Sequence, residues 1–168
     1  RYPKYKEKIT IKTWMSEYSS VKGIRENLIY DEQRNIIGKA KGLWIFFDIK
    51  RRRPVRIFDE IKAKWSSSKE VSIECDLSNQ VPVIESGDIE TKIKVKRYDT
   101  DMNEHVNNIR YLDWLMDSIP NNYLENYTLS SIDGRFLGEA QVKDRLINYT
   151  RKGNDENTFF HTIKNFRT

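Results

Sequence analysis

Apolar and polar residues alternate along the first fifty positions of the chain, as half-buried β-strands require. The alternation is clear in KITIKTW at residues 8–14 and returns over residues 24–49. Within the second stretch, the polar residues DEQRN at 31–35 interrupt the apolar pattern and suit a turn. The pattern therefore predicts three strands at the start of the chain.

The apolar period changes to that of a helix after residue 104. From His105 onward, one stripe at helical spacing consists of Ile109, Leu112, Leu115, Met116 and Ile119. Pro120 is expected to end this helix. Further strands are predicted before and after it, over residues 90–99, 126–138, 140–153 and 158–166. An antiparallel sheet wrapped around one apolar helix, of the α+β class, fits this order.

The stretch between the two groups of strands differs in composition from both. Residues 50–70 hold a basic run, a proline and a serine tract, which favour a linker or an excursion from the sheet. A short helix is expected near residues 58–62. We therefore divide the chain into an N-terminal part at 1–62, a linker at 63–89 and a C-terminal part at 90–168.

The composition is that of a globular chain, with 38% hydrophobic and 33% charged residues among 168. No window approaches the apolar run of a membrane span, and no secretory signal is visible, so a cytosolic or organelle-lumen location is expected. A single cysteine excludes an internal disulfide framework, and only two histidines argue against a metal site. The net charge of +5 favours an acidic partner.

The junction KRYDTDMNEHVNNIRYLDW at residues 96–114 concentrates candidate chemistry where a strand meets the helix. Asp101, Asn103 and His105 stand at every second position, with His105 expected to face the sheet. One interpretation is structural: Asp101 and Asn103 are preferred N-cap types, and His105 is a satisfied core residue. The other is a catalytic centre whose oxyanion is stabilised by free amides at the helix N-terminus. Spacing alone favours the structural interpretation.

At these residues the sequence resembles a known family. The segment RYDTDMNEHVNNIRYLDWLMDSIP is similar to the second-half signature of the acyl-acyl carrier protein thioesterases of plant plastids and bacteria. The family pattern D-x-N-x-H-V-N-N is matched by Asp101, Asn103 and His105 with the residues that follow. In LSSIDGRFLGEAQVKD, Glu139 matches the family glutamate, and Ala140 stands where the family has a cysteine or a small residue. A third similarity lies in GLWIFFDIKRRRPVRIFDEI, at residues 42–61.

The resemblance implies a tandem, or double, hotdog fold and hydrolysis of acyl-acyl carrier protein to free fatty acid, without metal or organic cofactor. The chain begins directly in the first group of strands, so the first hotdog unit is expected to be incomplete and to lack its long helix. Either the sequence is truncated, or a second copy covers the first sheet, as in a homodimer. The implied location is the bacterial cytoplasm or the plastid stroma.

The resemblance also implies roles for the site residues. Because Ala140 has no thiol, covalent cysteine catalysis is excluded at that position, and direct attack of water is expected. Glu139 would activate the water, and His105 would share the base or orienting role. Asn103 would position the water or the carbonyl, Asp101 would fix Asn103 or His105, and the backbone N–H groups of His105 and Val106 would receive the oxyanion. Without the resemblance, Glu139 would be interpreted as a solvated surface charge.

The basic run carries the expected partner contact. A solvated loop is its ordinary interpretation, but an acidic acyl carrier protein would be steered by it. The candidate docking residues are Lys50, Arg51, Arg52, Arg53 and Arg56. A nucleic-acid partner ranks last, because no nucleic-acid-binding signature accompanies the run. The alternatives left open are hydrolysis of acyl-coenzyme A and a non-catalytic acyl-thioester binding module on the same fold.

Overall fold

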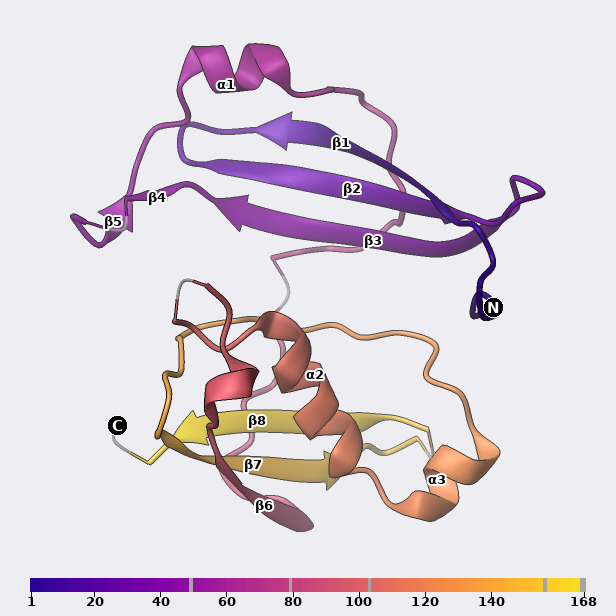
Figure 1. The fold of residues 1–168 in the computed structure, drawn as a ribbon, viewed down its shortest axis with the longest axis vertical. Coiled ribbons are helices and arrows are strands. Elements are labelled where there is room, and N and C mark those ends of the chain that lie inside the picture. Colours follow the sequence, from indigo (N-terminus) through magenta and orange to yellow (C-terminus); the bar gives the residue numbers. More distant parts are fainter. Residues whose placement is uncertain (49, 79, 103, 156, 167–168) are drawn as a thin grey trace. The chain divides into compact units, whose positions relative to one another are not determined.

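A computed structural model describes residues 1–48, 50–78, 80–102, 104–155 and 157–166. The chain forms two compact units, Arg1–Asn79 and Gln80–Thr168 (Figure 1). Each unit carries its own antiparallel sheet of three strands. Within the described ranges, no helix has the length and apolar character needed to cross a membrane.

The first unit is built on the three strands that the alternating pattern predicts. They are β1 (Thr10–Tyr18), β2 (Lys22–Tyr30) and β3 (Ile36–Ile45), with β2 in the centre. The turn between β2 and β3 lies at the predicted DEQRN segment, where the Asp31 N–H donates to the Asn35 carbonyl at 3.0 Å. The prediction of three opening strands is confirmed.

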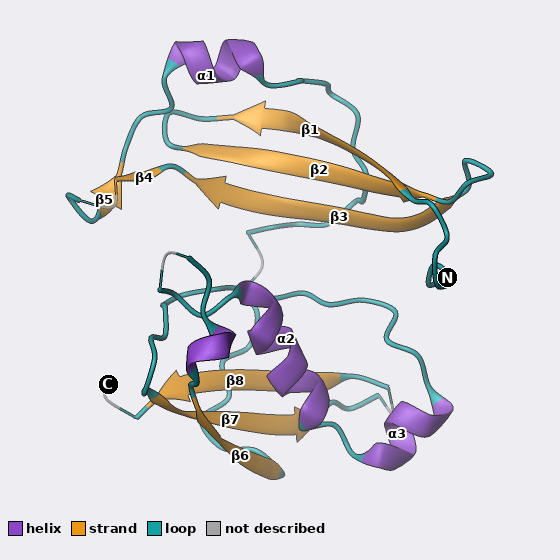
Figure 2. Ribbon diagram, viewed as in Figure 1, coloured by secondary structure: helices purple, strands orange, loops and turns teal. Residues whose placement is uncertain are grey.

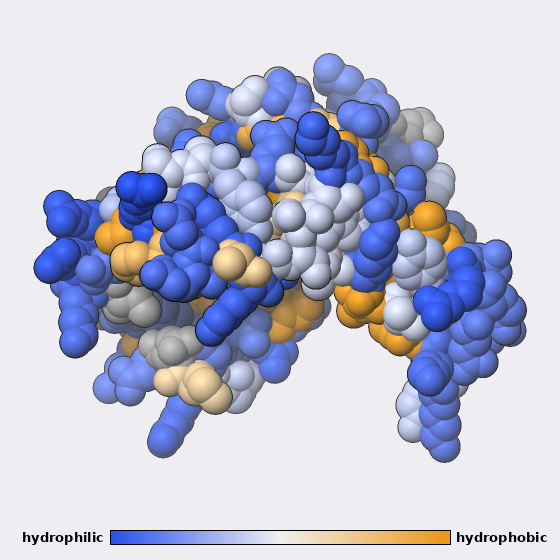
Figure 3. Space-filling view, turned by 90° about the horizontal axis from the view of Figure 1, so that it is seen from above, coloured by the Kyte–Doolittle hydropathy of each residue, from blue (hydrophilic) through white to orange (hydrophobic). Residues whose placement is uncertain are grey.

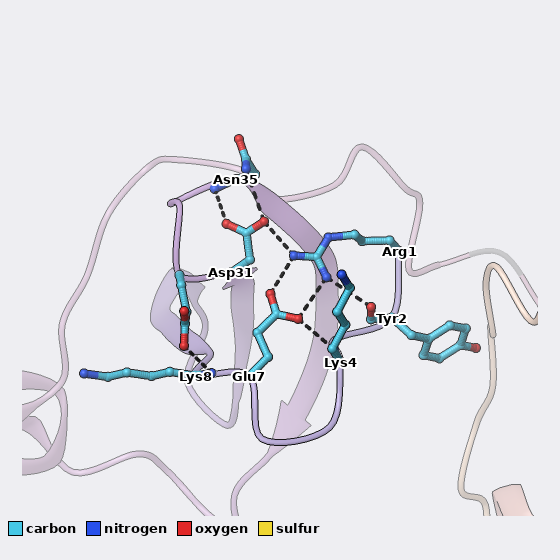
Figure 4. A network of polar contacts seen from close by, with 8 residues as sticks. Arg1, Tyr2, Lys4, Glu7, Lys8, Asp31 and Asn35 are labelled. Atoms are coloured by element: carbon cyan, nitrogen blue, oxygen red, sulfur yellow. Dashed lines mark hydrogen bonds and ion pairs between the residues drawn. The ribbon is translucent and has the colours of Figure 1, made fainter.

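The N-terminal segment is fastened to this turn by charged groups (Figure 4). The Arg1 guanidinium lies 2.6 Å from the Glu7 carboxylate and 2.8 Å from that of Asp31. Asp31 is buried and also accepts the Asn35 N–H at 2.8 Å. The hydrogen bond from Arg1 lowers the pKa of Glu7 to about 2. The residues before β1 are therefore held against the turn that joins β2 to β3.

A small hairpin and a short helix follow the first sheet. The hairpin pairs β4 (Phe47–Asp48) with β5 (Arg53–Pro54), and the helix α1 spans Asp59–Lys64. Acidic residues in the first turn of α1 and basic residues in its last turn complement the helix dipole. A short helix is thus present close to the range predicted for it.

The segment predicted as a linker packs on the first unit in its early part. Ser67 forms a parallel bridge with Met15 of β1, and the Trp14 indole donates to the Glu70 carbonyl at 2.8 Å. The fully buried carboxylate of Glu26 accepts the Ser72 N–H at 3.0 Å and the Ser72 hydroxyl at 2.5 Å. These bonds satisfy a buried charge that would otherwise be costly. They also bind residues 67–72 to the sheet.

The second unit combines a sheet with a helix on one of its faces (Figure 2). Its strands are β6 (Ile89–Lys94), β7 (Arg145–Lys152) and β8 (Phe159–Asn165), with β7 in the centre. A 3-10 turn at Arg97–Asp99 leads toward helix α2 (Asn108–Asp117), and α3 (Asn121–Asn126) follows. The core of the unit consists of Val95, Val106, Ala140 and Leu146.

Two predictions about the second unit are wrong. No strand forms over residues 126–138: α3 ends at Asn126, and the residues after it run outside the sheet as far as residue 138. The apolar side chains of Ile132, Phe136 and Leu137 are more than half exposed there, so the alternation was not a sign of burial. The helix begins at Asn108 rather than His105, because residues 105 and 106 take part in β-bridges instead.

Candidate active site

The segment that carries His105 lies between two other backbone segments of the second unit. On one side, the Asp101 N–H donates to the His105 carbonyl at 2.9 Å, and the Asn107 N–H donates to the Asp99 carbonyl at 2.9 Å. On the other side, His105 forms an antiparallel bridge with Gln141. His105 is therefore fixed by backbone hydrogen bonds ahead of the helix, not by the helix itself.

This arrangement brings His105 and Glu139 together although 33 residues separate them in the chain. Nε2 of His105 lies 3.4 Å from Oε2 of Glu139. The imidazole is about one-third exposed and the carboxylate about two-thirds exposed, so both groups are open to water. A half-exposed acid–base pair of this kind can exchange protons with a bound water molecule.

The residue after Glu139 is held by its backbone on both sides. Ala140 is 4% exposed; its carbonyl accepts the Val106 N–H at 3.1 Å, and its own N–H donates to the Tyr111 hydroxyl at 3.1 Å. The Val106 N–H is therefore already used within the protein. An oxyanion donor must point at a free position, so this bond argues against Val106 as a donor, and that role stays a prediction.

Asp101 and Asn103 are placed differently from each other. Asp101 is exposed, and its carbonyl accepts the Glu104 N–H at 3.1 Å in a turn where Glu104 has a positive φ of 64°. The backbone of Asp101 also lies next to that of His105, because the Asp101 N–H donates to the His105 carbonyl. Asn103 lies outside the described residues. The proposed roles of the two side chains therefore stay predictions.

Helix α2 is capped by a residue other than those expected. The Asn107 side chain accepts the Ile109 N–H at 3.1 Å, and its carbonyl accepts the Arg110 N–H at 2.8 Å. The prediction of Asp101 as N-cap is wrong, because the N-cap is Asn107 and the helix starts seven residues after Asp101. The structural interpretation of the junction loses this support, since the side chain that caps α2 is that of Asn107.

Two residues that support the site were missed by sequence reasoning. Asp99 is 4% exposed; its carboxylate accepts the Lys96 N–H at 2.7 Å and lies 4.0 Å from the Arg110 guanidinium. Tyr111 reaches from α2 to Ala140, and burial raises the pKa of its phenol. Both residues lie in the segment 96–114 that the sequence analysis singled out. Their partners depend on contacts made in the folded chain, which the spacing of residues in the sequence does not reveal.

The other histidine lies in a separate place in the second unit. His161 on β8 faces a buried polar group formed by Ser118, Asn148 and Thr150, with its Nδ1 3.0 Å from Thr150 Oγ1. Burial lowers the pKa of His161 to about 4. At neutral pH this imidazole is therefore uncharged, and it lies on a strand rather than in the His105 junction.

The predicted docking residues lie on the β4–β5 hairpin and just beyond it. All five side chains are exposed: Lys50, Arg51, Arg52, Arg53 and Arg56. Two of them lie near acidic groups, Arg51 at 3.9 Å from Asp48 and Arg56 at 4.0 Å from Asp59. Hydrophilic residues cover most of the surface seen in Figure 3.

Comparison with known families shows the family to which the chain belongs. Residues 84–167 match the family model described as the acyl-ACP thioesterase C-terminal domain, and residues 1–65 match that of the N-terminal domain. The chain belongs to the acyl-ACP thioesterase family. The two matched ranges fall within the two compact units, which fits one domain of the family in each unit.

Individual relatives agree with the family. An oleoyl-acyl carrier protein thioesterase of Coriandrum sativum, named as chloroplastic, is 26% identical over 94% of this chain. A chloroplastic acyl-[acyl-carrier-protein] hydrolase of Cuphea viscosissima is 27% identical over 98% of the chain. The chain spans 46% and 42% of the lengths of these two relatives.

The fold of the acyl-ACP thioesterases is also seen among solved structures. The 12:0-ACP thioesterase of Umbellularia californica matches 99% of this chain with a TM-score of 0.82 at 19% identity, and the chain covers 66% of that structure. An acyl-ACP thioesterase of Bacteroides thetaiotaomicron matches 96% of the chain with a TM-score of 0.78, and 65% of that structure is covered. The predicted α+β hotdog fold is confirmed.

Proposed function

We propose that this chain carries out the hydrolysis of an acyl-acyl carrier protein thioester, releasing a free fatty acid. The observation that carries this proposal is the His105–Glu139 pair at 3.4 Å, in a chain of the acyl-ACP thioesterase family. The relatives' names state the same substrate class. A purely structural junction has no need of an exposed carboxylate directed at an imidazole.

The reaction begins with a water molecule held by the pair. Glu139 accepts a proton from the water as its oxygen attacks the thioester carbonyl carbon. The carbonyl π electrons move onto the oxygen, and the tetrahedral intermediate then collapses with cleavage of the C–S bond. The proton held by the pair passes to the leaving thiolate, so the products are a carboxylic acid and a thiol. With alanine at position 140, no acyl-enzyme on that residue is required.

His105 serves this reaction by orienting Glu139. With Glu139 ionised, a neutral imidazole that carries its proton on Nε2 donates to the carboxylate across the 3.4 Å contact. This bond directs the second carboxylate oxygen toward the water. We prefer the His105 backbone N–H as the oxyanion donor, because the Val106 N–H already bonds to Ala140. Asn103 and Asp101 keep the positioning roles that the family pattern implies.

We place the carrier-protein contact on the β4–β5 hairpin. Lys50, Arg52 and Arg53 extend the positive charge of Arg51 and Arg56 over one exposed loop. Charged residues on an exposed rim mainly accelerate association and select a partner of opposite sign. An acidic carrier protein would gain from this surface, whereas acyl-coenzyme A would gain only through its phosphates. The compartment that we propose for this reaction is the plastid stroma or the bacterial cytoplasm.

The experiment that tests the function measures free-thiol release from acyl carrier protein and coenzyme A thioesters. Glu139→Gln keeps the shape of the side chain but removes its basicity, and His105→Ala removes the partner. We expect a loss of about 100-fold in kcat for each, which is the lower range for removing a general base. The matched control is Glu125→Gln, an exposed glutamate on α3, which should retain full turnover.

The outcomes separate the three candidate functions. Turnover of carrier-linked substrate that is lost in both variants supports the proposal. Equal turnover of both substrates would favour the acyl-coenzyme A hydrolase. A folded protein that binds acyl thioesters without turnover would contradict hydrolysis and favour the binding module, and full activity of Glu139→Gln would remove that carboxylate from the mechanism.

A further inference from the structure

Tyr111 connects helix α2 to the segment that carries the proposed base. Its hydroxyl oxygen accepts the N–H of Ala140 at 3.1 Å. The ring is held by edge contacts with Trp114, at 5.3 Å between centroids, and with Phe136, at 5.7 Å. A tyrosine packed on two sides has little rotational freedom, so its oxygen offers a fixed acceptor.

The N–H that Tyr111 receives belongs to the peptide group that joins Glu139 to Ala140. Holding this N–H fixes the plane of the peptide directly after Glu139. The next peptide is also held, because the Ala140 carbonyl accepts the Val106 N–H at 3.1 Å beside His105. Two hydrogen bonds therefore determine where the Glu139 backbone lies relative to His105.

Backbone control matters here because the Glu139 side chain is about two-thirds exposed. An exposed glutamate samples several rotamers, and packing does not choose among them. The 3.4 Å approach to His105 is then productive only if the Glu139 Cα is held within reach of the ring. The bond to the Tyr111 hydroxyl supplies that restraint from the rigid helix side.

We propose that Tyr111 is a positioning residue of this hydrolase, whose hydroxyl holds the Glu139–Ala140 peptide so that Glu139 meets His105. The inference rests on the proposed function for its effect on turnover, and on the hydrogen bond to Ala140 for its structural part. Burial raises the pKa of the phenol, so the hydroxyl stays neutral and adds no charge beside Glu139.

Tyr111→Phe tests the proposal, because it keeps the ring contacts and removes only the acceptor. We expect kcat to fall by about 10- to 100-fold, as for a small misplacement of a reacting group, while KM stays within about twofold. The matched control is Tyr123→Phe on α3, where the tyrosine makes ring contacts with Tyr127 and Phe159 in the same unit. It should keep wild-type kcat.

A double-mutant cycle separates positioning from a general loss of stability. If Tyr111 acts through Glu139, adding Tyr111→Phe to Glu139→Gln should lower the remaining kcat by less than about twofold. An equal loss in both backgrounds would show that Tyr111 acts elsewhere and would overturn the proposal. So would wild-type kcat in the single variant Tyr111→Phe while Glu139→Gln is inactive, and that outcome would leave the proposed function intact.

A second readout does not depend on turnover. Amide hydrogen exchange at Ala140 should become faster in Tyr111→Phe, and the His105 ring resonances should shift in the same direction in Tyr111→Phe as in Glu139→Gln. If the wild type releases no thiol, the proposed function fails, and these signals still decide whether Tyr111 holds Glu139 at His105. Unchanged Ala140 exchange or an unchanged His105 ring in Tyr111→Phe would refute the inference.

Discussion

Acid should destabilise the second unit through His161, and the hydrogen bonds around this residue identify the cause. The Ser118 hydroxyl donates to the Leu115 carbonyl at 2.6 Å, and the Thr150 hydroxyl donates to Ser118 Oγ at 2.9 Å. Because the Thr150 proton is used in this way, Nδ1 of His161 must be the donor in its 3.0 Å contact with Thr150 Oγ1. Protonation therefore adds a charge at Nε2 of a half-buried ring.

The size of the effect follows from the pKa. Burial lowers the pKa of His161 from 6.5 to about 4. A difference of about 2.5 corresponds to about 3.4 kcal/mol if each pKa unit is 1.36 kcal/mol, but the ring is partly exposed, so we expect about 1–2 kcal/mol after solvent screening. The unfolded chain binds the proton first as the pH falls below 6.5. Stability is therefore complete above pH 6.5 and declines as the pH falls toward 4.

Urea unfolding at pH 7 and at pH 4.5 measures this loss, with His161→Gln as the non-titrating comparison. Trp114 is the tryptophan of the second unit, so its indole resonance reports unfolding of that unit alone. Other titrating groups are common to both proteins and cancel in the difference. The wild type should lose about 1–2 kcal/mol more than the variant over this range. Equal losses, or a His161 ring that titrates at 6.5 in the folded protein, would refute the reasoning.

Two other substitutions test the docking surface and the packing of the second unit. Arg52→Glu with Arg53→Glu should raise KM for carrier-linked substrate by about 10-fold at low salt and leave kcat unchanged, because exposed charges act on association; an unchanged KM would place the dock elsewhere. A Cβ at Gly87 would lie 2.7 Å from the Thr150 backbone nitrogen, so Gly87→Ala should lower the free energy of unfolding by about 1–3 kcal/mol. Gly134→Ala is the matched control, since a Cβ there meets nothing within 4 Å; similar urea midpoints for both variants would contradict the packing argument.

Local pattern was enough to predict much of the fold. Alternation located β1, β2 and β3, and the helical stripe located α2, since each signal depends on neighbours in the sequence. The prediction of a strand at 126–138 was wrong because alternation alone does not provide a partner strand. This segment is not part of the β6-β7-β8 sheet. Alternation also occurs in exposed segments, so it predicts a strand reliably only where one face is covered.

The predicted start of the helix was wrong for a different reason. His105 lies at the start of the helical stripe in sequence, but a bridge from His105 to Gln141 and one from Val106 to Thr100 keep this segment extended. The Asn107 side chain then caps α2 where the extended segment ends. The competing bond from Val106 to Ala140 spans 34 residues, and no local preference encodes it. The same non-local bond argues against Val106 as an oxyanion donor.

The family pattern named His105 and Glu139 as parts of one site, and the structure adds their contact and the means by which it is held. Position 140 contributes to this through its peptide groups, which bond to Val106 and Tyr111. Its side chain is buried in the core cluster and does not point to the water-accessible pair. A peptide group is the same for alanine as for cysteine, so alanine in place of the thiol leaves the position of Glu139, the proposed base, unchanged. This is why the absence of a cysteine is compatible with hydrolysis by water at this site.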